Sequence, residues 1–113
     1  MNERYDVYHN PEKFGLRVVA EIEYSDNCYQ FDTRVVWEDE IGTRYTARDS
    51  GCSCPSPFED YTSLVDLDYY DFSALLEEVN GEIEAASGEY RSFGNDNIAD
   101  DGAEFISRLV SRP

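Results

Sequence analysis

The spacing of the apolar residues changes partway along the chain, and this change constrains the fold more than any other feature. Between residues 16 and 24 apolar and polar side chains alternate, with Val19 as the only breach, and a second alternating run follows over residues 29–38. A period of two is typical of half-buried strands. From Phe72 onward apolar residues recur at spacings of three and four, the pattern of an amphipathic helix. The sequence therefore predicts strands first and helices afterwards.

Three antiparallel strands are expected, because short turn segments rich in Ser, Asp, Asn and Gly separate three runs of strand-forming residues. The third run is rich in Tyr and Thr, and the turn before it contains Gly42. The segment before Leu16 is predicted to form an extra strand or an arm. The expected strands cover residues 16–24, 29–38 and 43–48.

A first helix is expected from Phe72, with Asp71 or Ser73 as its cap. Gly81 weakens its middle, so the helix either breaks near that residue or continues to Ala86. The apolar stripe of this helix consists of Phe72, Leu75, Leu76, Val79 and Ile83.

A last helix is expected from Asp101, after a loop over residues 87–97. Asp101 and Glu104 have the spacing of a capping box, with Asp in place of Ser or Thr. These elements predict an α+β fold, in which an antiparallel meander of three to four strands is covered on one face by two helices. The apolar face of this last helix comprises Phe105, Ile106, Leu109 and Val110.

With 113 residues, the chain is expected to form a single domain over residues 1–113. It divides by composition into a strand-rich part (1–50), a loop with cysteines and prolines (51–60) and an acidic helical part (61–113). Two prolines, one glycine and three serines within residues 49–59 predict irregular structure there.

Acidic residues outnumber basic ones, with 25 Asp and Glu against nine Lys and Arg and a net charge of -16. Residues 59–104 alone hold fourteen acids and one base, Arg91. Such a charge disfavours direct binding to nucleic acid or to an anionic membrane. No apolar run approaches the roughly 20 residues of a membrane span, and no signal peptide is recognisable. We expect a cytoplasmic protein.

Tyrosines interleave with the carboxylates of the acidic part, and this combination predicts a partner-binding face. Tyrosine gives a large contact area with few rotors to order, while carboxylates steer a basic partner. A solvated surface that only keeps the protein soluble would have a similar composition. The expected partner is a basic protein, including one that binds nucleic acid, and the chain itself is expected to be a monomer or weak dimer. The predicted contact residues are Asp66, Asp68, Tyr69, Tyr70, Asp71, Glu77, Glu78, Glu82 and Glu84.

The cysteines suggest an alternative, a small structural or regulatory zinc-binding protein that uses Cys28, Cys52 and Cys54, with His9 as a possible fourth ligand. The Cys-x-Cys spacing argues against this set, because structural zinc knuckles usually offer Cys-x2-Cys. Packed free thiols are the simpler interpretation. No cofactor is therefore expected in the favoured hypothesis, and the metal content of the purified protein would separate the two.

No catalytic activity is expected. His9 is the only histidine, and no serine lies in a Gly-x-Ser-x-Gly elbow to pair with it. The seven glycines are scattered, so no phosphate-binding loop is recognisable.

Three segments of the chain carry a resemblance, namely YDVYHNPEKFGL at 5–16, DSGCSCPSPFE at 49–59 and Tyr29-x-Phe31-Asp32-x-x-x-Val36-Trp37. They resemble a family of small acidic proteins encoded by actinobacterial phages and their hosts, a family without an assigned activity, and this implies a location in the cytoplasm of a bacterial host cell. The resemblance implies a phage origin, and small acidic phage proteins often inhibit host machinery or antiviral defence by binding. We therefore expect a non-enzymatic inhibitor that occupies a basic surface of a host protein, as a DNA mimic or as an anti-defence protein.

Overall fold

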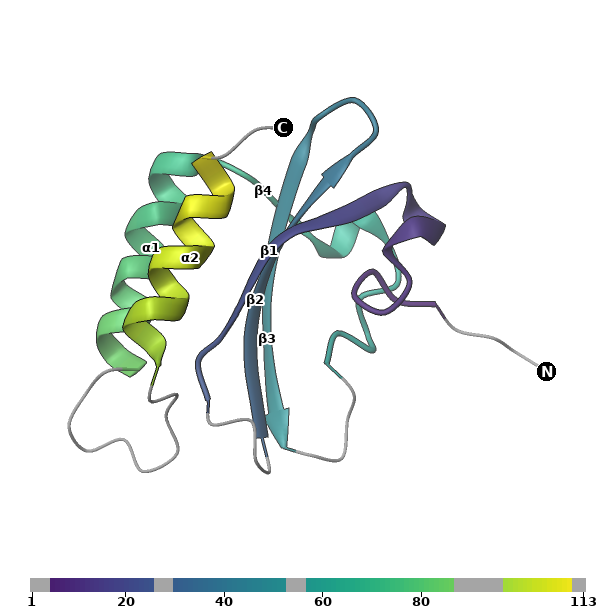
Figure 1. Ribbon diagram of the computed structural model, residues 1–113. Coiled ribbons are helices and arrows are strands. Elements are labelled where there is room, and N and C mark those ends of the chain that lie inside the picture. Colours follow the sequence, from purple (N-terminus) through teal and green to yellow (C-terminus); the bar gives the residue numbers. More distant parts are fainter. Residues whose placement is uncertain (1–4, 26–29, 53–56, 87–96, 111–113) are drawn as a thin grey trace.

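A computed structural model describes residues 5–25, 30–52, 57–86 and 97–110, except for the side chain of Cys52, and its centre is a four-stranded antiparallel sheet in the order β1-β2-β3-β4 (Figure 1). Two helices lie side by side against one face of this sheet. The α+β class, the meander and the pair of covering helices are therefore confirmed. The elements are β1 (Leu16–Glu23), β2 (Gln30–Asp39), β3 (Arg44–Cys52), β4 (Asp68–Tyr69), α1 (Phe72–Ala86) and α2 (Ile98–Val110), with short 3-10 helices at Pro11–Phe14 and Leu64–Asp66.

The face of the sheet opposite the helices is also covered, by residues 5–15 and 57–67 (Figure 1). Val7, Trp37 and Phe58 are fully buried there. The indole nitrogen of Trp37 donates a hydrogen bond of 3.0 Å to the carbonyl of Val7, which fixes the N-terminal arm to β2. The sheet is thus the middle of three layers, and β2 is buried on both faces.

Val19, which interrupts the alternation of apolar and polar residues, forms a β-bulge. Val18 pairs with Trp37 but Ala20 pairs with Val36, so Val19 has no partner in the register of β2. An extra residue moves the following side chains to the other face of the sheet. Leu16 therefore packs beside Trp37, whereas Ala20 and the later apolar residues of β1 face the helices.

One prediction about the strands is wrong. Regular structure does not stop at residue 48, because β3 continues to Cys52, opposite Gln30 at the start of β2. A long β2 supplies pairing partners that outweigh the poor strand propensity of Ser50 and Gly51. The segment before Leu16 forms an arm, the second of the two predicted alternatives, and the fourth strand is β4, which pairs with residues 45 and 46 of β3.

The first helix is continuous through Gly81, and Asp71 holds its N-cap position, since the carbonyl of Asp71 accepts from the amide of Leu75 at 2.8 Å. The second helix begins at Ile98, earlier than the predicted start at Asp101. The amide of Asp101 already makes a helical bond to the carbonyl of Asn97.

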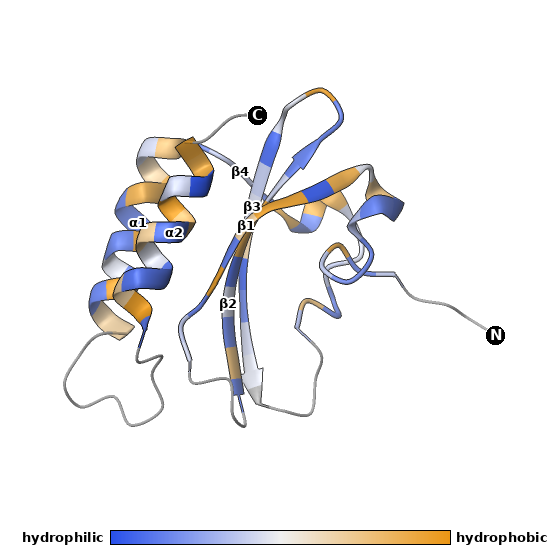
Figure 2. Cartoon of the chain, viewed as in Figure 1, coloured by the Kyte–Doolittle hydropathy of each residue, from blue (hydrophilic) through white to orange (hydrophobic). Residues whose placement is uncertain are grey.

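The predicted capping box is therefore wrong. Glu104 instead pairs with Arg108 one turn later, at 2.8 Å. Hydrophobic positions form stripes along both helices (Figure 2), and Phe105 and Leu109 of the second helix are buried against the sheet. Val110 departs from its predicted place on the apolar face, because it is 62% exposed.

The two helices approach closely at Gly102. A Cβ atom there would lie 2.5 Å from Cδ1 of Ile83 on α1. Glycine at this position therefore allows both helices to share one face of the sheet. Within the described residues, no helix is long and apolar enough to cross a bilayer.

Candidate functional site

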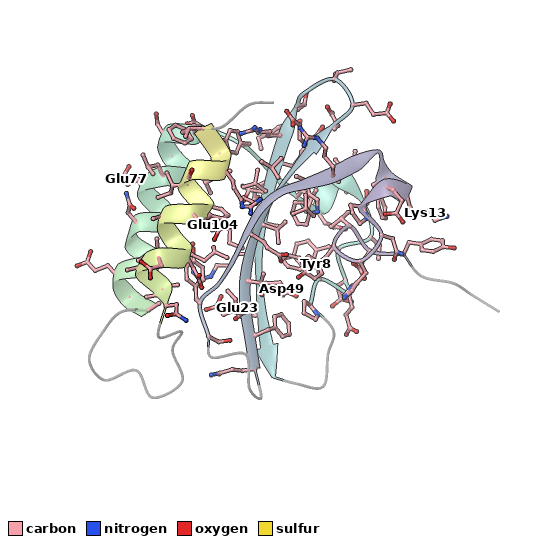
Figure 3. All side chains as sticks on the ribbon, in the orientation of Figure 1. Tyr8, Lys13, Glu23, Asp49, Glu77 and Glu104 are labelled. Atoms are coloured by element: carbon pink, nitrogen blue, oxygen red, sulfur yellow. The ribbon has the colours of Figure 1, made fainter. Side chains whose placement is uncertain are left out.

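A groove of about 640 Å³ lies between β4 and α1, and five of the nine predicted contact residues line it. Four of these residues are carboxylates, and no basic side chain is part of the lining. Figure 3 shows Glu77 on the side of α1 that is turned away from the sheet. The groove is lined by Asp68, Tyr69, Asp71, Glu77 and Glu78, together with Thr46, Ala74 and Leu75.

Local structure explains why these side chains converge. Only Tyr70 and Asp71 separate β4 from α1, so the strand and the helix diverge from this short connection. Ala74, Glu77 and Glu78 follow at spacings of three and four, which places them on one side of the helix. Asp68 pairs across the sheet with Thr46, whose side chain is on the helix side.

The end of β4 is held by contacts between Tyr70 and Arg44 of β3. The amide of Tyr70 donates to the carbonyl of Arg44, and the Arg44 guanidinium lies over the ring of Tyr70 at 5.5 Å. Arg44 also donates to the carbonyl of Leu109 at 2.8 Å, so the same side chain connects the sheet to the end of α2. These contacts fix the position of one wall of the groove.

The two predicted tyrosine contacts differ in environment. Tyr69 is 88% exposed, with its ring 6.4 Å from that of Tyr45. Tyr70 is half-buried and packs against the core between helices and sheet. Tyr69 can therefore contact a partner with most of its surface, whereas Tyr70 contributes to the attachment of β4.

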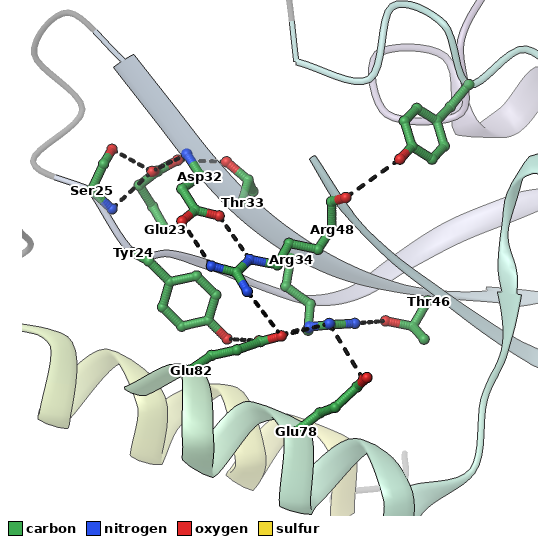
Figure 4. Close-up of polar contacts among 11 residues, drawn as sticks. Glu23, Tyr24, Ser25, Asp32, Thr33, Arg34, Thr46, Arg48, Glu78 and Glu82 are labelled. Atoms are coloured by element: carbon green, nitrogen blue, oxygen red, sulfur yellow. Dashed lines mark hydrogen bonds and ion pairs between the residues drawn. The ribbon is translucent and has the colours of Figure 1, made fainter. Parts of the chain in front are cut away.

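One predicted contact residue, Glu82, points towards the sheet instead of towards the groove (Figure 4). Both of its oxygens accept from Arg34, at 2.9 and 2.7 Å, and the hydroxyl of Tyr24 donates to it at 2.5 Å. Arg48 lies 3.2 Å from the same carboxylate and also binds Asp32 through two hydrogen bonds of 2.8 Å. In this conformation Glu82 connects α1 to β2, to β3 and to Tyr24, the residue that follows β1.

The charges of this network stabilise one another. Burial alone would raise the pKa of Glu82, but the hydrogen bonds from Arg34 and Tyr24 and the charges of Arg34 and Arg48 hold it below its ordinary value. Burial and the hydrogen bond to Glu82 raise the pKa of Tyr24. Glu82 is thus an ionised acceptor and Tyr24 a neutral donor at neutral pH.

Glu78 lies between the network and the groove. Its side chain is 67% exposed and one oxygen is 3.5 Å from Nη2 of Arg34. The remaining predicted contacts, Asp66 and Glu84, are exposed but do not line the groove. Asp66 accepts from the amide of Thr62 at 3.2 Å, next to Val65, which is 87% exposed.

Val65 is not among the predicted contact residues, although its place in the sequence gave one indication that it is exposed. It follows Leu64 in a polar segment, outside every alternating or helical apolar stripe. Apolar residues in such a place have no periodic face to bury and often remain at the surface.

The predicted zinc ligands Cys28 and Cys54, and the side chain of Cys52, lie outside the described residues. Within the described part of the chain, no group of three or more metal-ligating residues is found. His9 contacts Asp6 through Nδ1 at 2.9 Å and the ring of Tyr8 edge-on. The zinc hypothesis stays a prediction.

Comparison with curated proteins and with solved structures gave no significant match. A protein-family model, described as a domain of unknown function (DUF7574), matches residues 5–111. The match includes the arm, the whole sheet and both helices. The chain belongs to the DUF7574 family.

Proposed function

We propose that this chain is a non-enzymatic binding protein whose groove between β4 and α1 occupies a basic surface of a partner protein. The observation that carries the proposal is the convergence of Asp68, Asp71, Glu77 and Glu78 on one groove, which Tyr69, 88% exposed, also lines. Carboxylates around an aromatic residue match the chemistry of interfaces that recognise arginine and lysine.

The distribution of basic side chains supports the same proposal. Each arginine of the described residues is within 4 Å of a carboxylate of its own chain, at pairs that include Arg34 with Glu82 and Arg48 with Asp32. These cations are therefore engaged within the fold. The carboxylates of the groove keep a negative potential that a cationic partner can neutralise.

The partner we propose is a bacterial host protein with a basic surface, and a nucleic-acid-binding surface is the largest class of this kind. In that case the chain acts as an inhibitor that competes with nucleic acid, in the manner of a DNA mimic or an anti-defence protein of a phage. Charge-steered complexes of this type weaken as salt screens the exposed charges over about 10 Å at 0.1 M.

The test compares two variants with the same change in net charge. The groove variant carries Asp68→Asn, Asp71→Asn and Glu77→Gln, and the control carries Glu12→Gln, Glu40→Gln and Glu84→Gln, all at exposed positions outside the groove. Asn is as good an N-cap as Asp, so Asp71→Asn preserves the helix start. Tagged proteins are incubated with actinobacterial lysate and eluted in salt steps, and captured proteins are identified by mass spectrometry.

We expect a basic protein that the wild type and the control capture and the groove variant does not. Displacement of duplex DNA from that protein by the wild-type chain would establish competition with nucleic acid. Equal capture by all three proteins would contradict the groove as the binding site. Equal loss in both variants would mean that net charge, and not the groove, drives the association.

A further inference from the structure

The outer edge of β4 lies at the end of the sheet and borders the groove of the proposed function. In the strand order β1-β2-β3-β4 this strand is terminal, and it pairs only with β3. The extended backbone continues on both sides of β4, since Leu67 has φ -99° and ψ 153° and Tyr70 still bonds to β3. The edge therefore reaches from Leu67 to Tyr70, along one wall of the groove.

The pairing with β3 shows which backbone groups of this edge point outward. The amide of Tyr70 donates to the carbonyl of Arg44 at 3.3 Å, so it points towards β3. Across a trans peptide the carbonyl and the following amide point in opposite directions, and none of the described peptide bonds is cis. The carbonyl of Tyr69 therefore points away from β3. Because hydrogen-bonded and non-hydrogen-bonded pairs alternate in an antiparallel ladder, the amide of Tyr69, which is paired with Tyr45, also points outward.

The edge offers an amide and two carbonyls to an incoming strand. Asp68 forms the next hydrogen-bonded pair, with Thr46, so the carbonyl that precedes its amide, that of Leu67, points outward as well. No described residue makes a hydrogen bond to this carbonyl or to the amide and carbonyl of Tyr69. Unpaired groups at the edge of a sheet are a template for an added strand.

We propose that an extended segment of the partner pairs with β4 as an additional strand, in which basic and apolar side chains alternate. The inference rests on the proposed function, because the basic side chains of this segment occupy the acidic groove. The main-chain hydrogen bonds fix the register of the segment, while the carboxylates attract it.

The two faces of β4 specify the side chains of the added strand. Asp68 is on the helix side, opposite Thr46, whereas Tyr69 is on the other side with Tyr45, where the ring centroids are 6.4 Å apart. Residues directly opposite each other on paired strands share a face. A β-branched apolar residue opposite Tyr69 therefore packs on its ring. The neighbours of this residue point to the helix side, towards Asp68 and Glu77, and there a basic side chain is complementary.

Charge selects a partner segment over a second copy of the chain. Carboxylates line the groove and no basic side chain does. A second copy would bring another net charge of -16 to this edge, and its own Asp68 to the same groove. A segment with arginine or lysine at alternate positions neutralises the groove instead.

The probe is a synthetic peptide of alternating valine and arginine, blocked at both ends, in three forms. In the proposed register the valine amides face β4 and the arginine amides point away from it. One form is unmodified, the second is methylated at the backbone nitrogen of every valine, and the third at that of every arginine. The two methylated forms have the same charge and the same number of methyl groups. Isothermal titration measures the affinity of each form for the wild-type protein.

We expect the unmodified and the arginine-methylated peptides to bind with similar affinity, and the valine-methylated peptide to bind about tenfold more weakly, because it cannot donate to Tyr69 and Leu67. Binding of the unmodified peptide should also protect the amide of Tyr69, which hydrogen exchange followed by NMR measures.

Two substitutions at Tyr69 test the same edge from the side of the protein. Tyr69→Pro removes the ring and the outward amide, which an edge strand tolerates, whereas Tyr69→Ala removes only the ring. The side chain is 88% exposed, so the loss of the ring itself should not disturb the fold. We expect Tyr69→Pro to bind the unmodified peptide about threefold to tenfold more weakly than Tyr69→Ala does.

Three results would overturn the proposal. Equal affinity of the two methylated peptides would show attraction by charge alone and would leave the proposed function intact. Protection of amides in β1 without protection at Tyr69 would place the peptide at the other edge of the sheet. Absence of binding by the unmodified peptide would also contradict the added strand.

The proposed function fails by a different result. It is contradicted if the groove variant with Asp68→Asn, Asp71→Asn and Glu77→Gln binds the unmodified peptide as tightly as the charge-matched control variant does. If the groove variant binds more weakly and the two methylated peptides still differ, both the acidic groove and the added strand are supported.

Discussion

The two faces of the sheet are covered by different means. On one face, two amphipathic helices pack apolar stripes against β1 and β2, and a network of Glu82, Arg34 and Arg48 crosses the interface. On the other face, two irregular segments cover Trp37. There the contacts are aromatic, with the ring of Phe58 edge-on to Trp37 at 5.6 Å and stacked on Tyr8 at 5.2 Å.

The difference follows from how each kind of covering segment pairs its backbone amides and carbonyls. A helix makes its own hydrogen bonds, so its side chains are free to supply periodic apolar and ionic contacts. Irregular segments need partners for their buried amides and carbonyls. Here these partners include Trp37 for the carbonyl of Val7, Asp49 for the amide of Phe58 and the carbonyl of Tyr61 for the amide of Val7.

The largest expected effect is on the face without helices. Trp37→Ala should lower the free energy of unfolding by about 3–5 kcal/mol, because it leaves a cavity beneath the arm. Trp37→Phe keeps most of the ring but leaves the Val7 carbonyl without its donor, at a cost of about 1–2 kcal/mol. Trp37 is the only tryptophan, so urea unfolding is followed by circular dichroism.

A loss below about 1 kcal/mol in Trp37→Ala would mean that the arm does not depend on this side chain. The same result would remove the contrast between the two faces.

The next effect concerns the packing of the two helices. Gly102→Leu should destabilise the protein by about 1–3 kcal/mol, because the side chain has no space beside Ile83. Gly81→Ala on α1 is the matched control, since a Cβ there meets nothing within 4 Å. It should stabilise the protein by about 0.5–1 kcal/mol. Thermal unfolding of both variants tests the close approach, and similar melting temperatures would contradict it.

The ionic network should contribute less than the aromatic core. Glu82→Gln leaves Arg34 and Arg48 with a neutral acceptor and should cost about 2 kcal/mol, because buried Arg34 and the more exposed Arg48 lose their shared charge partner. Glu78→Gln, at the exposed end of the same network, should cost less than about 1 kcal/mol. Urea denaturation at neutral pH distinguishes them, and equal losses would mean that burial does not set the strength of these pairs.

The smallest expected effect is a dependence of the stability on pH, which should arise only on the face of the sheet that α1 and α2 cover. The pKa of Glu82 is lowered in the folded state, so its contribution is present above the unfolded value of about 4.3 and is lost as pH falls through the folded pKa. The stability difference between wild type and Glu82→Gln should therefore shrink on acidification.

The difference between wild type and Trp37→Phe should stay constant over the same acidic range, because neither the indole nor the Val7 carbonyl titrates. Urea titrations from about pH 6 to about pH 3 measure both differences. If the difference in the free energy of unfolding between wild type and Glu82→Gln does not change with pH, Glu82 is not an ionised carboxylate that the folded state stabilises.

The change of apolar period by itself determined the order of strands and helices and therefore the fold class, because burial on one side of a strand or helix requires that repeat. It also placed Glu77 and Glu78 on the polar side of α1. The sequence did not determine the cover of the second face, since residues 5–15 and 57–67 have no periodic pattern. It also did not determine which side chains of β1 face the helices, because the bulge at Val19 moves the residues after it to the opposite face of the sheet.

Only the tertiary structure decided which acidic residues turn inward. Glu78 and Glu82 are one helical turn apart, and both looked equally suited to a partner-binding face. Glu82 is directed towards Arg34, 48 residues away in sequence, because the sheet brings that guanidinium beneath the helix. Composition counts charges, but whether a carboxylate is paired or available depends on cations that only long-range packing brings near it.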